Sequence, residues 1–289
     1  GAVTIIDGLC VVGIERGLME LADWCDTTVE LVSGRHDHLE LAALAAAAQF
    51  WWLQNRVEEI PPAAERMSRV DGSAEHHLAL ELVAVRATLS PERWADAIER
   101  LQRALARYGP REPTWATGQL VVFLVLLGGL DESAAAPIAR QLNSPVLSAT
   151  FAFYRAVPYY VRDEDEVGSE LAGEAVAMAR TAGATLQTAT ALMGQGGWRA
   201  RVSRFADAEI FEPLVESLDL WERLRIRWGR IAIIEEIAQS LAIRGYPIEA
   251  MVLWGAVDST GIEAPAKAGR HRRTAAHISA VSPAQAEEL

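Results

Sequence analysis

The sequence predicts an all-α fold built from short helices joined by tight turns. Alanine and leucine dominate the composition, whereas the β-branched residues that favour strands are sparse. Nearly every segment repeats its apolar residues at helical spacing over roughly ten to twenty residues and closes at glycine, proline or asparagine. The chain has 289 residues, and 51% of them are apolar. Since a single compact core seldom grows beyond roughly 250–300 residues, we expect two domains or an elongated array.

The first half of the chain is predicted to form six helices. "EIPPAAERM" is interpreted as a turn, and Ser90, Pro91 and Gly109 as the N-cap, first residue and stop of one helix. "PREP" at Pro110–Pro113 opens the apolar helix that runs through Leu127. The other four predicted helices are Thr4–Val32, Leu39–Asn55, Ala74–Leu89 and Ala134–Leu142.

The second half continues the same pattern. Serine and proline in "NSP" open a helix through Tyr160, and the acidic run Arg162–Glu166 suits the N-terminus of the next. Because the connections are short, sequential helices should pack as antiparallel neighbours. The remaining predicted helices are Val167–Thr181, one from "AGA" through Ser203, Glu209–Leu224, Trp228–Ile243 and Pro247–Thr260.

A repeating arrangement of small residues predicts how these helices pair. Gly245 falls in a turn, Ala238 and Ala250 stand where two helices would cross, and Trp254 follows on the same face, with Pro265 ending the pattern. This is the spacing of a tetratricopeptide-type helix pair of about 34 residues. The second-helix pattern recurs at Ala97, Leu101 and Ala104, and at Ala172, Val176 and Ala179. We therefore expect residues 1–289 to form one α-solenoid of antiparallel helix hairpins.

Residues 186–265 resemble a known family. The stretches "ESLDLWERLRIRWGRIAIIEE" and "AQSLAIRGYPIEAMVLWGAVDSTGIEAP" are similar to the C-terminal helical region of actinobacterial LuxR-type and related regulators. Those proteins join an ATPase module of the signal-transduction class to tetratricopeptide-like repeats, and some add a DNA-binding or a nucleotide cyclase domain.

The resemblance implies a fragment of a larger regulator, whose role is to sense a signal or bind a partner. The implied partner is a peptide, a small effector or the ATPase module of the same parent chain. The Walker A pattern is absent from this sequence and no basic helix-turn-helix is evident, so ATP and DNA binding are assigned to none of its residues.

Charge and cysteine usage restrict the function further. The net charge of −12 argues against direct nucleic-acid binding. The longest apolar run, Leu120–Leu130, is too short to cross a bilayer. On one continuous helix Cys10 and Cys25 would lie roughly 22 Å apart, too far for a disulfide. Two buried thiols in a reducing cytoplasm are therefore expected.

No arrangement of residues predicts catalysis. A nucleophile elbow is missing, and the serines and histidines are scattered. His36, Asp37 and His38 form either a solvated turn or part of a metal site, and adjacent His76 and His77 cannot both chelate one ion on a helix. We expect a non-catalytic chain without metal or cofactor. The alternatives are a free-standing repeat scaffold and an all-helical enzyme whose site is unrecognised.

Two patterns suggest a ligand. "GQGGW" at Gly194–Trp198 indicates either close helix packing under an aromatic ring or a kink that shapes a pocket beside Trp198. Arg223, Arg227 and Arg230 would share one stripe on a continuous helix, between Trp221 and Trp228. This stripe either binds an anionic ligand or acidic peptide, or forms salt bridges. The candidate binding residues are Arg223, Arg227, Arg230, Trp228, Trp198 and Arg199, with Arg201 and Arg204 beside the last.

Overall fold

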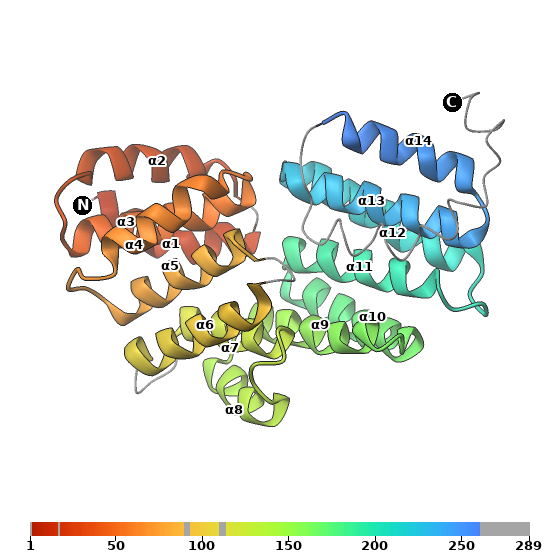
Figure 1. Ribbon diagram of the computed structural model, residues 1–289, viewed down its shortest axis with the longest axis horizontal. Coiled ribbons are helices and arrows are strands. Elements are labelled where there is room, and N and C mark those ends of the chain that lie inside the picture. Colours follow the sequence, from red (N-terminus) through yellow and green to blue (C-terminus); the bar gives the residue numbers. More distant parts are fainter. Residues whose placement is uncertain (1, 17, 90–92, 110–113, 261–289) are drawn as a thin grey trace. The chain divides into compact units, whose positions relative to one another are not determined.

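The computed structural model describes residues 2–16, 18–89, 93–109 and 114–260 (Figure 1). These residues form fourteen α-helices and one 3₁₀ helix, and none of them lies in a strand. The predicted all-α class is therefore confirmed. None of the helices in these ranges has the length and apolar character needed to cross a membrane.

The chain divides into two compact units. Unit 1 contains Gly1–Arg155 and Met178–Leu186, and unit 2 contains Ala156–Ala177 and Gln187–Leu289. A single continuous array over residues 1–289 remains a prediction.

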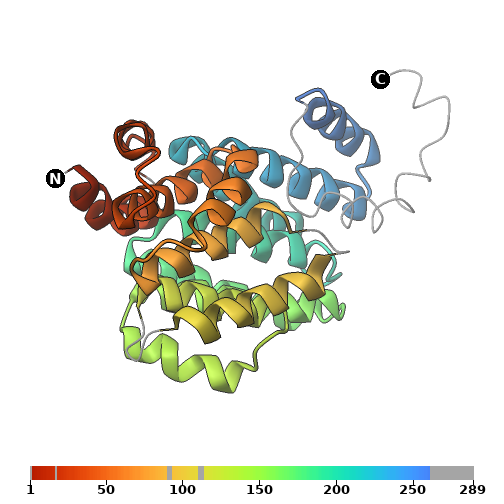
Figure 2. The same ribbon diagram turned by 60° about the vertical axis from the view of Figure 1, so that its left-hand side comes forward.

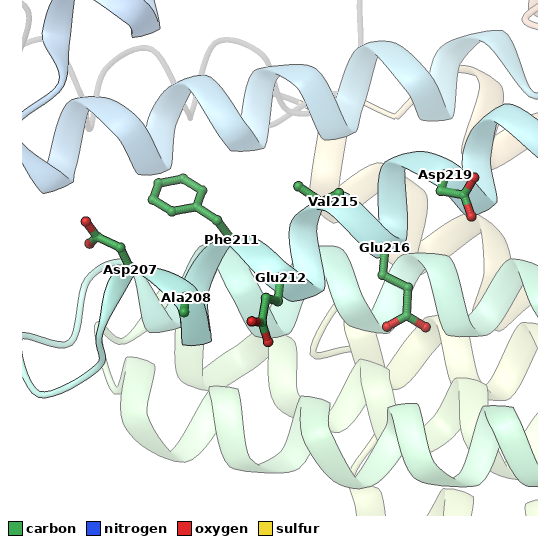
Figure 3. A pocket seen from close by; sticks show the side chains of 7 residues that line it. All are labelled: Asp207, Ala208, Phe211, Glu212, Val215, Glu216 and Asp219. Atoms are coloured by element: carbon green, nitrogen blue, oxygen red, sulfur yellow. The ribbon is translucent and has the colours of Figure 1, made fainter.

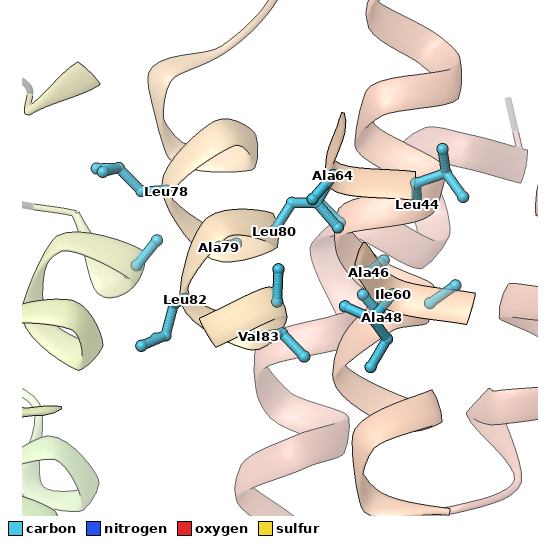
Figure 4. Close-up of a cluster of buried hydrophobic side chains, with 14 of the residues drawn as sticks. Leu44, Ala46, Ala48, Ile60, Ala64, Leu78, Ala79, Leu80, Leu82 and Val83 are labelled. Carbon is cyan, nitrogen blue, oxygen red and sulfur yellow. The ribbon is translucent and has the colours of Figure 1, made fainter. Parts of the chain in front are cut away.

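Unit 1 is built around α5, which packs on α3, α4, α6 and α7. Figure 4 shows leucine, alanine and valine side chains of α5 meeting those of α3 and α4, including Leu80, Leu44 and Ile60. The helices of this unit are α1 (Ala2–Arg16), α2 (Leu21–Val32), α3 (His38–Leu53), η1 (Val57–Glu59), α4 (Ile60–Met67), α5 (Ala74–Ala87), α6 (Trp94–Tyr108), α7 (Trp115–Leu126), α8 (Glu132–Leu142) and most of α9 (Pro145–Val161).

The predicted single helix Thr4–Val32 is wrong, because the chain forms α1 and α2 there. The break lets the side chain of Leu21 pack directly on Gly13, where an added Cβ would collide with it. The 22 Å separation expected for the two cysteines therefore does not apply. Cys10 and Cys25 are nevertheless both buried and free, as expected.

The predicted turn "EIPPAAERM" is also wrong, because it holds helix α4. Its two prolines, Pro61 and Pro62, occupy the first turn of the helix, where a missing N–H costs nothing. Ile60, Ala64 and Met67 then reach the core of unit 1.

The pattern around α6 is confirmed where the structure describes it. Ala97, Leu101 and Ala104 are buried along one face, and the helix ends at Gly109. The predicted cap at Ser90 and Pro91 and the helix start at Pro110–Pro113 lie outside the described residues. The helix predicted after "NSP" begins at Pro145, with the Ser144 hydroxyl accepting from the Leu147 N–H at 3.2 Å.

Unit 2 holds the start of α10 (Asp165–Ala182), most of α11 (Thr185–Arg199), and α12 (Asp207–Leu224), α13 (Arg227–Arg244) and α14 (Pro247–Asp258). The expected acidic first turn of α10 contains Asp165 and Glu166. The prediction that the next helix reaches Ser203 is wrong. α11 ends at Arg199 because the following N–H groups, those of Arg201 and Val202, bond to carbonyls three residues back and tighten the chain into turns.

The last hairpin has the packing that its sequence predicts. Gly245 takes a φ of +92° after α13, which favours glycine. Ala238 and Ala250 are fully buried where α13 and α14 cross, and Trp254 joins the same cluster. The two helices lie side by side in Figures 1 and 2. Pro265 lies outside the described residues. Of the remaining repeat positions, Ala172, Val176 and Ala179 are all buried.

Candidate ligand-binding site

The expected arginine stripe does not lie on one helix. α12 ends at Leu224, and Arg225 takes a left-handed φ of +55° before α13 begins at Arg227. Arg223 and Arg230 therefore project from different helices. The stripe required a continuous helix, and the condition is not met, whereas the predicted separate helices Glu209–Leu224 and Trp228–Ile243 are confirmed within a residue or two.

Two of the three stripe arginines form surface ion pairs. Arg223 pairs with Asp219 one helical turn earlier, and Arg230 Nη1 lies 3.1 Å from Glu222 Oε2. Arg227 is exposed and has no ion pair or hydrogen bond among the described residues. Exposed pairs of this kind contribute about 0–1 kcal/mol each. The salt-bridge alternative thus accounts for Arg223 and Arg230.

The two tryptophans beside the stripe belong to the core of unit 2. Trp221 is fully buried against Gly229, and its ring centre lies 5.3 Å from that of Trp228. Trp228 also packs with Ile231 and Val257.

The earlier arginines are equally engaged inside unit 2. Arg199 donates from Nη1 to the Glu209 carbonyl at 3.1 Å and lies 5.1 Å from the ring centre of Phe205. Arg201 is mostly buried, with its Nη1 3.5 Å from Asp165 Oδ1. Arg204 pairs with Glu166 at 2.7 Å.

"GQGGW" is a packing segment, and α11 passes through it without a break. A side chain at Gly196 would collide with Leu214 of α12, and one at Gly197 would collide with Glu236 of α13. Trp198 is buried beside Tyr160 and Gly168. The close-packing interpretation is therefore confirmed for Gly196 and Gly197, but their neighbours are Leu214 and Glu236 and not an aromatic ring.

The histidine motifs have structural contacts. Asp37 caps α3 by accepting from the N–H groups of Leu39 and Glu40, at 3.0 and 3.2 Å. His76 lies 2.8 Å from Asp7, and His77 stacks on Tyr108 with ring centres 4.5 Å apart. Over the described ranges no three His, Cys, Asp or Glu side chains are grouped to hold a metal ion.

The arginine with the most unusual surroundings is Arg86, which the sequence did not single out. It stands near the end of α5, and its guanidinium carbon lies 4.9 Å from the ring centre of Phe123 and 5.5 Å from that of Trp52. Its Nη2 donates to the Gln119 side-chain carbonyl at 3.3 Å. We call Arg86, Gln119, Phe123 and Trp52 the Arg86 cluster.

Three neighbouring helices position the Arg86 cluster. α5 is capped at its N-terminus by Ser73, whose hydroxyl accepts from the Glu75 N–H, and it packs on both α3 and α7. The end of α3 carries Trp52, and the middle of α7 carries Gln119 and Phe123. Tyr154 of α9 lies 6.3 Å from Phe123, ring centre to ring centre, and extends the aromatic lining.

The charge of Arg86 has no counter-charge in the described structure. Its one hydrogen bond there goes to a neutral amide, and no carboxylate pairs with it. Burial lowers the pKa of Arg86, but arginine starts so high that it stays charged at neutral pH. Buried charges are ordinarily paired. At Arg86 the faces of two aromatic rings take the place of a paired carboxylate.

A second surface feature is a shallow groove along the outer face of α12. It has a volume of about 780 Å³ and is lined mainly by apolar surface. Figure 3 shows Phe211 and Val215 on one side of this face and Glu212 and Glu216 on the other. The α12 groove consists of Asp207, Ala208, Phe211, Glu212, Val215, Glu216 and Asp219.

A third feature is a buried polar row on α13. Glu235, Glu236, Gln239 and Ser240 are all buried. Both amide atoms of Gln239 and the Ser240 hydroxyl have no hydrogen-bond partner among the described residues. Such groups cost about 1–3 kcal/mol each, so this row is a weak point of unit 2.

Comparison with known protein families finds no family that this chain matches, and no curated protein is similar to it.

Proposed function

We propose that this chain is a non-catalytic helical-repeat sensor that binds an anionic ligand at the Arg86 cluster. The carrying observation is a part-buried guanidinium held over two aromatic rings with no carboxylate beside it in the described residues. An arginine fork matches a carboxylate or a phosphate, and the rings of Trp52 and Phe123 suit an apolar body attached to it. The ligand class is a small anionic effector or an acidic peptide side chain.

The helix order supports a tetratricopeptide-like solenoid as the scaffold. α3, α5 and α7 are neighbours in space, and they alternate along the chain with α4 and α6. Stacked first helices of this kind form the continuous surface through which repeat proteins bind ligands. The small residues at Ala238 and Ala250 and the glycine turn at Gly245 follow the same scheme.

In a regulator of the kind that the family resemblance suggests, the Arg86 cluster would sense the signal. If an ATPase module of the parent chain exists in two states, an anion that binds one state better shifts their balance. The mechanism needs only differential affinity at the Arg86 cluster. The two free, buried thiols are in keeping with a cytoplasmic setting.

The test uses the full chain and the dye 8-anilinonaphthalene-1-sulfonate, an aromatic anion, as the probe. Arg86→Gln should weaken dye binding about tenfold or more, because a hydrogen bond to a charged group contributes roughly 1.5–3 kcal/mol. Arg86→Lys keeps the positive charge but lacks the forked guanidinium. Its dye affinity should therefore lie between that of the unchanged protein and that of Arg86→Gln.

The matched control is Arg100→Gln, because Arg100 belongs to the same unit but already pairs with Glu81 at 2.7 Å. Its dye affinity should equal that of the unchanged protein. Thermal melts confirm that all variants are folded, since this dye also binds loosened proteins. Equal affinity in Arg86→Gln and the unchanged chain would rule out the Arg86 cluster as the site.

A further inference from the structure

A small cavity lies among helices α1, α3, α5 and α7 of unit 1, and each of the four contributes residues to its wall. Its volume is about 130 Å³. One water molecule takes up about 30 Å³ of liquid, so the cavity has room for roughly four non-hydrogen atoms. We call it the Gln49 cavity, after the buried glutamine in its wall. The small side chains that leave this space open are Ala45, Ala46, Ala79 and Ala116.

The polar groups around the Gln49 cavity offer more hydrogen-bond acceptors than donors. Gln49 is 4% exposed, and its amide N–H donates to the Ala79 carbonyl at 3.5 Å. The side-chain carbonyl of Gln49 has no hydrogen-bond partner among the described residues, and neither has the carboxylate of Glu75. Asp7 uses its Oδ1 in the contact with His76 at 2.8 Å, which leaves its second oxygen available. A buried acceptor without a partner is satisfied by a ligand that donates.

The charge of the Gln49 cavity favours a cationic donor. Asp7 and Glu75 bring two carboxylates to its wall, which contains neither lysine nor arginine. Even a protonated His76 would balance only one of the two. A primary ammonium group has three N–H donors and no acceptor. Its donors match the three acceptors that Gln49, Glu75 and Asp7 leave open.

The Gln49 cavity and the Arg86 cluster lie on the same faces of three helices. Each helix places an alanine in the cavity wall and, seven residues later, a member of the Arg86 cluster. The pairs are Ala45 and Trp52 on α3, Ala79 and Arg86 on α5, and Ala116 and Phe123 on α7. Seven residues make about two helical turns, so each pair shares one helix face and is separated by about 10 Å along the helix axis. One surface of unit 1 therefore carries acceptors at one end and a guanidinium at the other.

From this arrangement we propose that the ligand is a small zwitterion whose primary amine enters the Gln49 cavity while its anionic group binds Arg86, about 10 Å away. The proposal rests on the proposed function of the Arg86 cluster and adds a second point of recognition. The two ends fix both the charge pattern and the length of the ligand. An anion without the amine makes only the contacts at Arg86.

Two chains that differ only in the amine test this proposal on the full protein. 8-Aminooctanoate holds its amine roughly 10 Å from its carboxylate when extended, and octanoate lacks the amine. Isothermal titration calorimetry measures the affinity of each. 8-Aminooctanoate should bind about tenfold more tightly or better, because its ammonium adds charge-assisted hydrogen bonds. 4-Aminobutanoate is too short to reach both ends and should bind no better than butanoate.

A substitution in the Gln49 cavity connects this difference to the site. Glu75→Gln should remove most of the advantage of 8-aminooctanoate and leave the affinity for octanoate unchanged. Glu65→Gln is the matched control, because Glu65 is exposed on α4 of the same unit and its carboxylate has no partner among the described residues. The control variant should keep the full advantage. Thermal melts verify that both variants are folded.

The outcomes separate this proposal from the one on which it rests. Equal affinities of the unchanged protein for 8-aminooctanoate and octanoate would overturn the zwitterion, and so would an advantage that survives Glu75→Gln. In either case the Arg86 cluster stands if Arg86→Gln still weakens octanoate binding. Octanoate binding that Arg86→Gln leaves unchanged would overturn both proposals.

Discussion

Gly229, in the first turn of α13, lies directly against the indole ring of Trp221 on α12, and a methyl group at position 229 would overlap that ring. Trp221 is fully buried and has no room to withdraw. The glycine is therefore required by the approach of two helices, and it carries no unusual φ. This contact fixes how α12 and α13 cross.

We expect Gly229→Ala to destabilise the protein by about 1–3 kcal/mol, because overpacking forces the buried indole out of place. Urea denaturation measures the loss. Gly255→Ala on α14 is the matched control, since an added Cβ there meets nothing within 4 Å. That control should be neutral or gain roughly 0.5–1 kcal/mol from helix propensity. If Gly229→Ala and Gly255→Ala changed the free energy of unfolding by similar amounts, the indole of Trp221 would have room for a methyl group at position 229.

Ala250→Leu should cost about 1–3 kcal/mol for a related reason. Ala250 is fully buried where α14 crosses Ala238, so the larger side chain has no space. Ala256 is exposed on the same helix, and Ala256→Leu provides the comparison. A thermal melt in which Ala250→Leu matches Ala256→Leu would contradict the close crossing.

Gln239→Met should stabilise unit 2 by about 1 kcal/mol or more, because it removes a buried amide that has no partner in the described structure. Met has a similar length and no polar atom to leave unbonded. Gln49→Met is the control, since the Gln49 amide donates to the Ala79 carbonyl at 3.5 Å. If Gln239→Met proves as destabilising as Gln49→Met, the Gln239 amide has a partner such as a buried water.

The buried cysteines should make stability fall at alkaline pH. Burial raises the pKa of Cys25 to about 12 and raises that of Cys10 as well. In the unfolded chain a thiol ionises near pH 8.5. The stabilising contribution is therefore complete below that pH and is lost as the pH rises toward the folded pKa.

Cys25→Ala removes one of these two titrations. Between pH 9 and pH 10 the unchanged protein should lose about 1 kcal/mol more than the variant. Denaturation at both pH values measures the change in the free energy of unfolding for each protein. Any stability that the substitution itself removes at neutral pH cancels in this comparison. If the unchanged protein and Cys25→Ala lost the same stability between these pH values, the Cys25 thiol would have to ionise as easily in the folded as in the unfolded state.

The sequence predicts the last hairpin well because its signals are local. A glycine in the turn and alanines at the crossing are separated by a few residues, and their positions follow from helix geometry alone. The helix at α4 is missed for an equally local reason. Pro61 and Pro62 look like helix breakers, but the first turn of a helix accepts proline.

The residues of the proposed binding site were harder to predict because they depend on which helices become neighbours. Trp52, Arg86 and Gln119 are more than thirty residues apart in sequence and meet only through the packing of α3, α5 and α7. The one local signal is that Arg86 is the only cationic residue in α5. The arginine stripe required one continuous helix, whereas the chain forms two there, as the predicted helices Glu209–Leu224 and Trp228–Ile243 already indicated, with Arg225 in a left-handed conformation between them.

The sequential packing of unit 2 also bears on how quickly this part of the chain can fold. Its most extensive helix contacts, α12 with α13 and α13 with α14, join elements that follow one another along the chain. Bringing two consecutive helices together closes only a short loop, so the chain loses little conformational entropy before the contacts form. Domains dominated by local contacts fold in microseconds to milliseconds. We therefore expect the hairpins of unit 2 to form early in folding, including the one that Gly245 turns between α13 and α14.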